Sequence, residues 1–327
     1  MTGQPGVAVV GLGLIGGSIC RRLQARADRV QGWDLDPATR SRAAATGLDV
    51  VDSLGDLLTP APQILVVAVP LRAMDTTLAA LRDPLDSATT VIDVGSVKAP
   101  VRRIITSYGL SRQYVGTHPM AGSERSGFDA STADLLVGAP WVVTVDDDTD
   151  PRRLLSVMGW IIDAFAGRVF PLDDRTHDAA VARVSHLPHA LATALMATAA
   201  SDEDAGLAAR MAAGSFRDGT RVAGTNPERT EAMITENAAH VAPLLRRVSA
   251  MLDGLADDLQ NGEDVSTFFA AAARARQRTD GAARTTGRLE LDPQDAPAVR
   301  RRLLEIGRGG GQFIAMDETR TTAHYRL

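Results

Sequence analysis

A short apolar run followed by closely spaced glycines constrains this chain more than any other feature. The run Val7–Val10 suits a buried parallel strand. Gly11, Gly13 and Gly16 follow at the spacing of a dinucleotide-binding turn, where glycines permit the turn, the approach of a pyrophosphate and close helix packing. Leu14–Ile15 then open a helix whose free N–H groups attract phosphate. The stretch predicts a strand–turn–helix unit that binds a nucleotide.

A second strand, predicted over Val30–Trp33, ends in an acid. Asp34 stands about twenty residues after the glycines, where a carboxylate can accept hydrogen bonds from an adenosine ribose. Because a carboxylate repels a 2′-phosphate, we expect NAD rather than NADP, although Arg40 and Arg42 nearby leave NADP open. The alternative is that Asp34 is a loop acid or a helix cap before Pro37.

Strands alternate with helices from residue 6 to about residue 170. This pattern predicts an α/β fold with a doubly wound, Rossmann-type parallel sheet, in which ligands bind beyond the carboxyl ends of the strands. The residues that follow each strand are therefore the candidates for the site. The expected strands are Val7–Val10, Val30–Trp33, Ile64–Val69, Thr90–Asp93, Tyr114–Thr117, Trp141–Val145 and Arg168–Phe170.

Two strand ends carry apolar or small residues. Val69 and Pro70 end the third strand, and their apolar character suits a nicotinamide ring. Gly95 lets the backbone turn after the fourth strand, and Ser96 places a hydroxyl at the sheet edge. Ser96 fits a helix N-cap equally well.

Lys98 is the only lysine in the chain. One interpretation is that a compact ammonium is needed there, near a carboxylate or the cofactor. The other is a chance occurrence in the first turn of a helix, and the sequence leaves both open.

His118 lies between the end of the fifth strand and Pro119. A histidine has an unperturbed pKa of about 6.5, so it is mostly neutral at pH 7 and can accept a proton. A lone histidine is more often structural. The position beside the expected nicotinamide site favours a general base.

From about residue 173 long alanine- and leucine-rich helices replace the alternation, which predicts an all-helical second domain. His177 opens it, and His186 and His189 share a face if the chain is helical despite Pro188. No cysteine or carboxylate stands at ligand spacing from them, so we expect no metal site.

Further along, Arg217 and Arg221 stand four residues apart among small residues. Guanidinium groups match carboxylates, so the pair indicates a small acidic substrate. The alternative is a surface pair between Arg217 and Asp218 with Arg221 in solvent.

The last fifty residues differ from the rest. We expect a linker over 281–287, then a strand, a helix and two strands over Arg288–Leu291, Pro297–Ile306, Gln312–Met316 and Ala323–Leu327. This appendage is expected to pack on the helical domain and is too short for a full regulatory domain. The expected domains are 1–172, 173–280 and 281–327.

Composition limits the remaining possibilities. At 327 residues the chain can form two domains with proper cores. A net charge of -5 without a basic patch argues against a nucleic-acid or anionic-membrane partner. Cys20 stands alone, which excludes an intramolecular disulfide, and no signal peptide or membrane span is evident. We therefore expect a cytoplasmic protein.

Five of these motifs, in this order and over residues 6–275, resemble the prephenate/arogenate dehydrogenase family. The joint pattern is much more specific than any single motif. The motifs are the Gly11/Gly13/Gly16 turn, Asp93–Lys98, Gly116–Gly122, Ser185–His189 and Phe216–Arg221.

The resemblance implies NAD-dependent oxidative decarboxylation of prephenate in tyrosine biosynthesis. Hydride would leave C4 for NAD, His118 would take the proton of the C4 hydroxyl, and CO2 would depart as the ring becomes aromatic. Ser96 would orient His118 or the hydroxyl. The substrate-binding residues implied are His186, His189, Arg221, which would grip a carboxylate, and Glu124, which would pair with Arg221 and gate access.

The resemblance also implies a homodimer built through the helical domain. Thr230 departs from the pattern, because many members carry an aromatic residue near this position. Prephenate, arogenate and a 4-amino analogue therefore stay open as substrates. A hydroxyacid dehydrogenase of similar plan is a more distant alternative, and an NAD-sensing dimer without catalysis would not need His118, Ser96 and Arg221 together.

Overall fold

The computed structural model describes residues 6–201, 205–280 and 285–327, which form two compact units. The α/β unit contains the described residues up to Asp178, together with Thr225–Arg229 and Thr286–Arg326. The helical unit contains Ala179–Gly224 and most of Thr230–Thr285.

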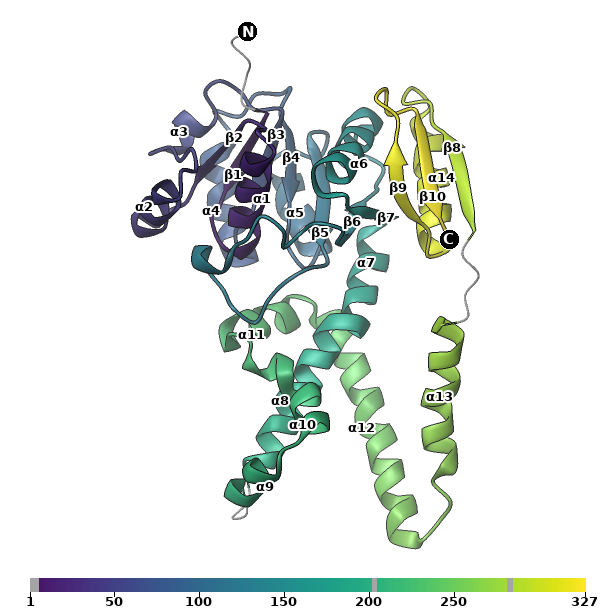
Figure 1. The fold of residues 1–327 in the computed structure, drawn as a ribbon. Helices are drawn as coiled ribbons and strands as arrows, with labels where there is room; N and C mark the ends of the chain where they lie inside the picture. The colour runs from purple at the N-terminus through teal and green to yellow at the C-terminus, as the bar shows by residue number, and fades with distance from the viewer. Residues whose placement is uncertain (1–5, 202–204, 281–284) are drawn as a thin grey trace. The chain divides into compact units, whose positions relative to one another are not determined.

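The predicted doubly wound parallel sheet is present in the α/β unit (Figure 1). Its first five strands are parallel and lie in the order β2-β1-β3-β4-β5, so β1 lies where the strand order reverses. Ligands of such sheets bind at this reversal. The strands are β1 Val7–Val10, β2 Val30–Trp33, β3 Ile64–Val67, β4 Thr90–Asp93 and β5 Tyr114–Pro119.

Helices cover both faces of this sheet because successive side chains of each buried strand point to opposite faces. Val7 and Val9 pack into one apolar cluster with α1 and α6, and Ala8 and Val10 into another with α4 and α5. The helices of this part are α1 Leu14–Ala25, α2 Pro37–Ala45, α3 Leu54–Leu57, α4 Leu71–Leu81, α5 Ala99–Ser107 and α6 Pro151–Phe165.

Strand β5 changes partner along its length. Its first half is parallel to β4, and from Thr117 onward it is antiparallel to β6, Pro140–Thr144, which is parallel to β7, Arg168–Leu172. We expected the strand to end at Thr117, but it continues to Pro119. His118 therefore lies inside a strand, opposite Val142, and its backbone is fixed on one side by β6.

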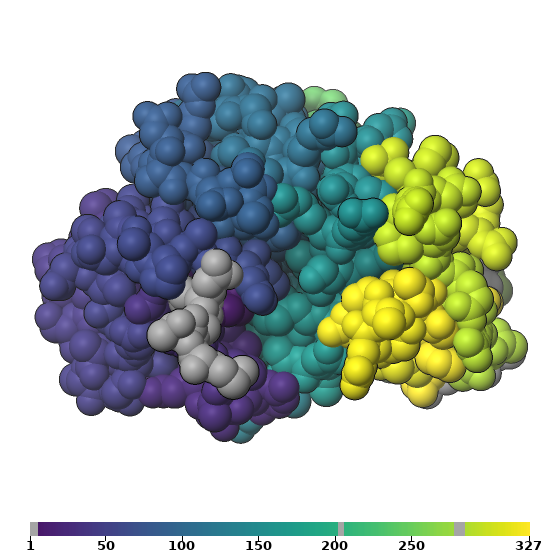
Figure 2. Space-filling view, turned by 90° about the horizontal axis from the view of Figure 1, so that it is seen from above, coloured from purple at the N-terminus to yellow at the C-terminus, as the bar shows by residue number. Residues whose placement is uncertain are grey.

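The expectation that the C-terminal appendage packs on the helical domain is wrong. Val169 of β7 pairs with Phe313 of β9, so the sheet continues into the appendage, which lies against the α/β unit in Figure 2. Leu289, Phe313 and Ala323 join the main apolar cluster of that unit. The elements of the appendage are β8 Thr286–Glu290, α14 Ala296–Arg308, β9 Gln312–Met316 and β10 Thr322–Arg326.

The expected linker falls partly outside the described residues. Residues 281–284 are not described, whereas Thr286 and Gly287 begin β8 and belong to the sheet.

Helices alone make up the described part of the helical unit, as the sequence predicts. Pro188 lies in the first turn of α8, directly after the π-helix over Ala182–His186, so the helical path continues past the proline. None of the described helices combines the length and the apolarity that crossing a bilayer requires. The elements are α7 Asp174–Val181, which begins in the α/β unit, the π-helix η2 Ala182–His186, α8 Leu187–Ala199, α9 Ala205–Met211, α10 Gly214–Thr220, the 3-10 helix η3 Arg221–Gly224, α11 Pro227–Glu236, α12 Ala238–Asn261 and α13 Ser266–Asp280.

We predict that Gly307→Ala loosens the appendage. A Cβ at Gly307 would lie 1.7 Å from the carbonyl oxygen of Pro171 in β7, so α14 would have to move off the sheet. Overpacking of this kind costs about 1–3 kcal/mol of unfolding free energy. Chemical or thermal unfolding measures the loss. Gly309→Ala is the control, because its Cβ would come no closer than 3.4 Å to its neighbours, and equal stabilities of the two variants would refute the packing argument.

Candidate active site

Two glycines of the first turn are required by the fold itself. Gly11 has φ +94°, and a Cβ there would lie 2.5 Å from the carbonyl oxygen of Ala68, which follows β3. A Cβ at Gly16 would lie 1.9 Å from the carbonyl oxygen of Gly11. The turn after β1, the end of β3 and the first turn of α1 are therefore in direct contact, as the spacing predicts.

Gly13 differs from these two, because a Cβ there would meet no atom within 4 Å. Gly13 is the N-cap of α1, no side chain caps this helix end, and its first turn carries no acid. A helix N-terminus of this kind attracts anions. The open face over Gly13 thus fits the pyrophosphate of a dinucleotide, which needs close access to backbone.

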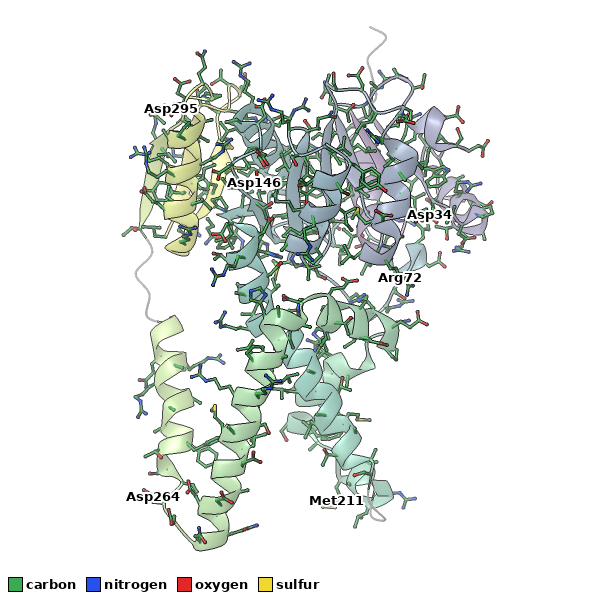
Figure 3. The ribbon with its side chains drawn as sticks, turned by 180° about the vertical axis from the view of Figure 1, so that it is seen from behind. Asp34, Arg72, Asp146, Met211, Asp264 and Asp295 are labelled. Atoms are coloured by element: carbon green, nitrogen blue, oxygen red, sulfur yellow. The ribbon has the colours of Figure 1, made fainter. Side chains whose placement is uncertain are left out.

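Asp34, labelled in Figure 3, holds the turn and the end of β2 together. Its carboxylate accepts hydrogen bonds from the backbone N–H groups of Leu12, at 2.7 Å, and Asp36, at 2.9 Å. The N-cap of α2 is Asp36, so the alternative that Asp34 is a helix cap is wrong. Each carboxylate oxygen can accept a second hydrogen bond, which leaves acceptor capacity for ribose hydroxyls.

The two arginines that left NADP open are held by the protein. Arg40 donates to the backbone carbonyl oxygens of Asp34 and Leu35, at 2.7 and 3.3 Å. Arg42 lies 3.8 Å from a carboxylate oxygen of Asp36 and 3.7 Å from one of Asp129. Both guanidinium groups thus have acceptors within the chain, which favours NAD.

The residues expected beside the nicotinamide lie at the same sheet edge. Val69 is half-buried against Gly11, and Pro70 begins α4. The backbone N–H of Gly95 donates to Asp93 at 2.8 Å and so fixes the turn that carries the half-buried Ser96. Ser96 is not the N-cap of α5, because Lys98 occupies that position.

Lys98 is fully buried and pairs with Asp93. Its ammonium also donates to the backbone carbonyl oxygen of Thr117 at 2.7 Å. Tyr114 donates its hydroxyl to Asp93 at 2.7 Å, and burial together with that carboxylate raises the pKa of Tyr114 well above its usual value. Of the two interpretations of the single lysine, an ammonium beside a carboxylate is confirmed. The ammonium of Lys98 holds Thr117, the residue that precedes His118.

His118 belongs to a chain of hydrogen-bonding groups that the sequence analysis missed. Its Nδ1 lies 2.9 Å from Nε2 of His177, whose Nδ1 lies 2.7 Å from a carboxylate oxygen of Asp178. His118 is half-buried and His177 is completely buried. The adjacency of His177 and Asp178 in the sequence was the available signal, but nothing local indicated that α7 meets β5.

The charge states of this chain follow from its surroundings. Burial lowers the pKa of His177, and the Lys98 ammonium adds to this effect against the opposing Asp178 carboxylate, so His177 is neutral at pH 7. Burial alone would raise the pKa of Asp178, but hydrogen bonds from His177 and from the N–H groups of Ala99 and Lys98 outweigh it. The net pKa of Asp178 is lowered, so it is ionised.

The remaining predicted residues are divided between the units. Glu124 is exposed in the α/β unit, on the segment that follows β5. In the helical unit, His189 is half-buried and donates from Nδ1 to the carbonyl oxygen of Ser185 at 2.8 Å. Arg221 begins η3 and is exposed.

His186 does not share the setting of His189. It is fully buried, and its Nδ1 lies 3.0 Å from the side-chain nitrogen of Asn237 at the start of α12. This contact joins η2 to α12, and a role of His186 in binding substrate stays a prediction.

A nucleotide-type turn, a polar chain ending on a strand histidine and a following helical unit define a two-domain dehydrogenase. Comparison with protein families agrees. The family described as prephenate dehydrogenase, nucleotide-binding domain, matches residues 19–168, and its dimerization domain matches residues 173–271. The chain belongs to the prephenate dehydrogenase family. The predicted family, fold class and enzyme class are confirmed.

Several relatives are similar over most of their length. Cyclohexadienyl dehydrogenase of Zymomonas mobilis is 32% identical over 278 residues, 83% of this chain and 94% of that protein. The crystal structure of Synechocystis arogenate dehydrogenase is 30% identical with a TM-score of 0.68, covering 84% of this chain and 97% of the other. Prephenate dehydrogenase of A. aeolicus, solved with hydroxyphenyl propionate and NAD+, is 27% identical with a TM-score of 0.76, covering 85% and 99%.

We predict that Gly13→Ala separates nucleotide binding from folding. The Cβ would enter open space and φ is −77°, so the free protein should keep its thermal stability. The methyl group would nevertheless stand where a pyrophosphate approaches the backbone, so the Kd for NAD should rise at least tenfold, as titration of the bound cofactor can measure. Gly16→Ala is the contrasting variant and should unfold at lower temperature. Unchanged NAD affinity in Gly13→Ala would place the pyrophosphate elsewhere.

Proposed function

We propose that this chain oxidises prephenate with NAD and releases CO2, giving 4-hydroxyphenylpyruvate in tyrosine biosynthesis. Hydride leaves C4 of the ring, the C4 hydroxyl loses its proton to His118, and the C1 carboxylate leaves as CO2 when the ring becomes aromatic. The observation that carries this proposal is the placement of His118 on β5, next to a buried and neutral His177.

NAD is the cofactor, and it supplies the hydride acceptor. The residues that would hold it are Gly11, Gly13 and Gly16 with the N–H groups of Leu14–Ile15 at the pyrophosphate, and Asp34 at the ribose. Towards the nicotinamide we place Val69, Pro70 and Gly95, which follow the ends of the neighbouring strands β3 and β4.

His118 is the proposed base, and Ser96 is the proposed partner that orients it or the substrate hydroxyl. Ser96 follows β4, and His118 lies near the end of β5. Both are therefore at the carboxyl edge of the sheet, where ligands of such sheets bind. The neutral His177 carries no charge that would oppose a proton arriving on His118, and it offers a hydrogen bond to the resulting imidazolium.

The helical unit is proposed to supply the anionic end of the substrate site. Arg221 is suited to a carboxylate, and His189 presents Nε2 because its Nδ1 donates to Ser185. Glu124 is proposed to pair with Arg221 before substrate binds. Both carboxylates of prephenate are anions that a guanidinium such as that of Arg221 can bind.

The helical unit also supports the proposal of a homodimer. Few of its large apolar side chains are buried, and many lie exposed, such as Met211, which is labelled in Figure 3 and is 72% exposed. A set of exposed apolar side chains of this size marks an interface. The exposed residues are Val184, Leu191, Leu195, Met196, Leu207, Met211, Met251, Leu252, Leu259 and Phe269.

The proposed reaction is tested by following NADH formation with prephenate and with arogenate supplied separately, each with NAD and with NADP. Activity with prephenate and NAD is expected to be highest. A higher kcat/KM with arogenate would make the chain an arogenate dehydrogenase, and a higher kcat/KM with NADP would contradict the role of Asp34.

We predict that His118→Asn lowers kcat about 10²–10⁴-fold, because it keeps a polar side chain but removes the proton acceptor. NAD affinity should stay unchanged, since the glycine turn and Asp34 are untouched. Steady-state kinetics and NAD titration check both statements. His324→Asn, an exposed change on β10, is the matched control. Near-normal kcat in His118→Asn would remove this residue from the chemistry.

We predict that Arg221→Ala weakens substrate use by about 2–5 kcal/mol, the usual cost of removing one partner of a desolvated charge pair. Arg221→Lys should recover only part of this loss, because an ammonium cannot make the two parallel bonds of a guanidinium. The ratio of kcat/KM values for the variants measures the effect. Arg301→Ala, an exposed change on α14, is the control. A wild-type KM and kcat in Arg221→Ala would show that the carboxylate binds elsewhere.

A further inference from the structure

We propose that His177 and Asp178 are positioning residues that fix the tautomer of His118, with the proton on Nδ1 and the proton-accepting lone pair on Nε2. The tautomer follows from the hydrogen-bond chain alone. Its consequence for catalysis rests on the proposed function, in which His118 is the base.

Backbone N–H groups set the orientation of the Asp178 carboxylate. Its Oδ1 accepts from the N–H of Lys98 at 2.8 Å, and its Oδ2 accepts from the N–H of Ala99 at 3.0 Å. The carboxylate therefore satisfies the first turn of α5 and is ionised, so it can only accept hydrogen bonds. Because Nδ1 of His177 lies 2.7 Å from Oδ1, that nitrogen must carry the proton.

The proton on Nδ1 of His177 determines the role of its other ring nitrogen. A neutral imidazole has one N–H, so with the proton on Nδ1 its Nε2 is an acceptor. This Nε2 lies 2.9 Å from Nδ1 of His118, a distance that fits a hydrogen bond only if one of the two nitrogens donates. Nδ1 of His118 must therefore carry the proton, and in neutral His118 the basic nitrogen is Nε2.

The opposite arrangement would require a protonated His177, and its surroundings disfavour that charge. The ring is completely buried and lies close enough to the Lys98 ammonium to be destabilised by it when protonated. The Asp178 carboxylate acts in the other direction, and the Asp93 carboxylate adds to it, but Asp93 is itself paired with Lys98.

The backbone and the ring of His118 are both held in place. Its backbone pairs with Val142 of β6, and the preceding carbonyl, that of Thr117, accepts from Lys98. Its ring meets that of His177 edge-on, with centroids 5.1 Å apart. When Nε2 takes a proton, the Nδ1–H of the new imidazolium already points at the lone pair of His177, so no rearrangement is needed to stabilise the charge.

Asp178→Asn does not test this order of donors cleanly. Oδ1 of Asp178 accepts from both the N–H of Lys98 and Nδ1 of His177, and Oδ2 accepts from the N–H of Ala99. Either orientation of an amide would place its nitrogen against at least one of these donors. The test therefore changes His177.

His177 provides the matched pair of variants. In His177→Gln the side-chain oxygen can reach the position of Nε2 and accept from His118, so kcat should stay within about tenfold of wild type. His177→Leu fills a similar space without an acceptor for Nδ1 of His118, so kcat should fall about 10²–10⁴-fold while KM for NAD stays within about twofold. Equal activity of the Gln and Leu variants would show that His177 only fills space and would overturn the proposal.

The tautomer can be read without turnover. ¹⁵N NMR of the imidazole nitrogens distinguishes the Nδ1–H from the Nε2–H form, with the His118 signals assigned by their loss in His118→Asn. Neutral His118 is expected as Nδ1–H in the wild type and in His177→Gln, and mainly as Nε2–H, the form that an unpartnered imidazole prefers, in His177→Leu. An Nε2–H form in the wild type, or an unchanged Nδ1–H form in His177→Leu, would overturn the inference. If the tautomers are as expected but His118→Asn keeps its kcat, the proposed base fails and the tautomer assignment stands.

Discussion

The site depends on one buried ion pair, that between Lys98 and Asp93. Both side chains are almost completely excluded from solvent, and burying a charge is costly unless hydrogen bonds replace those to water. Here they do, since Asp93 also accepts from Gly95 and Tyr114, and Lys98 donates to Thr117. The pair thereby ties the end of β4, the turn to α5 and the middle of β5 to one point. Its contribution is the arrangement of these segments rather than stability.

The inward side chain of Lys98 also explains why α5 begins where it does. Its N-cap position is held by Lys98, whose side chain turns inward and cannot cap, so the carboxylate of Asp178 satisfies the first N–H groups instead. The start of α7 is thus part of the α/β unit, ahead of the change to helices alone. One carboxylate consequently serves both a helix end and the ring of His177.

The sequence predicts features that depend on neighbouring residues and fails where distant segments meet. The strands and the glycine turn were predictable because each is encoded by a local pattern, and His118 because strand ends mark the ligand edge. His177 was missed, since its role requires α7 to lie against β5. The appendage was assigned to the wrong domain for a similar reason. Pairing of Val169 with Phe313 joins residues about 140 positions apart, and no local pattern selects the sheet edge that β9 joins.

The two units also differ in what holds them together. The α/β unit has an apolar cluster on each face of its sheet, and even its appendage contributes buried residues such as Phe313. The helical unit buries few large apolar side chains, and Met211 and Phe269 lie mostly in solvent. The family model that matches this unit is described as a dimerization domain, which agrees with the proposal that its exposed apolar side chains form an interface. The residues proposed to bind the nucleotide therefore lie on a unit with a large core of its own, whereas Arg221 and His189, proposed to bind the substrate, lie on a unit that buries little apolar surface.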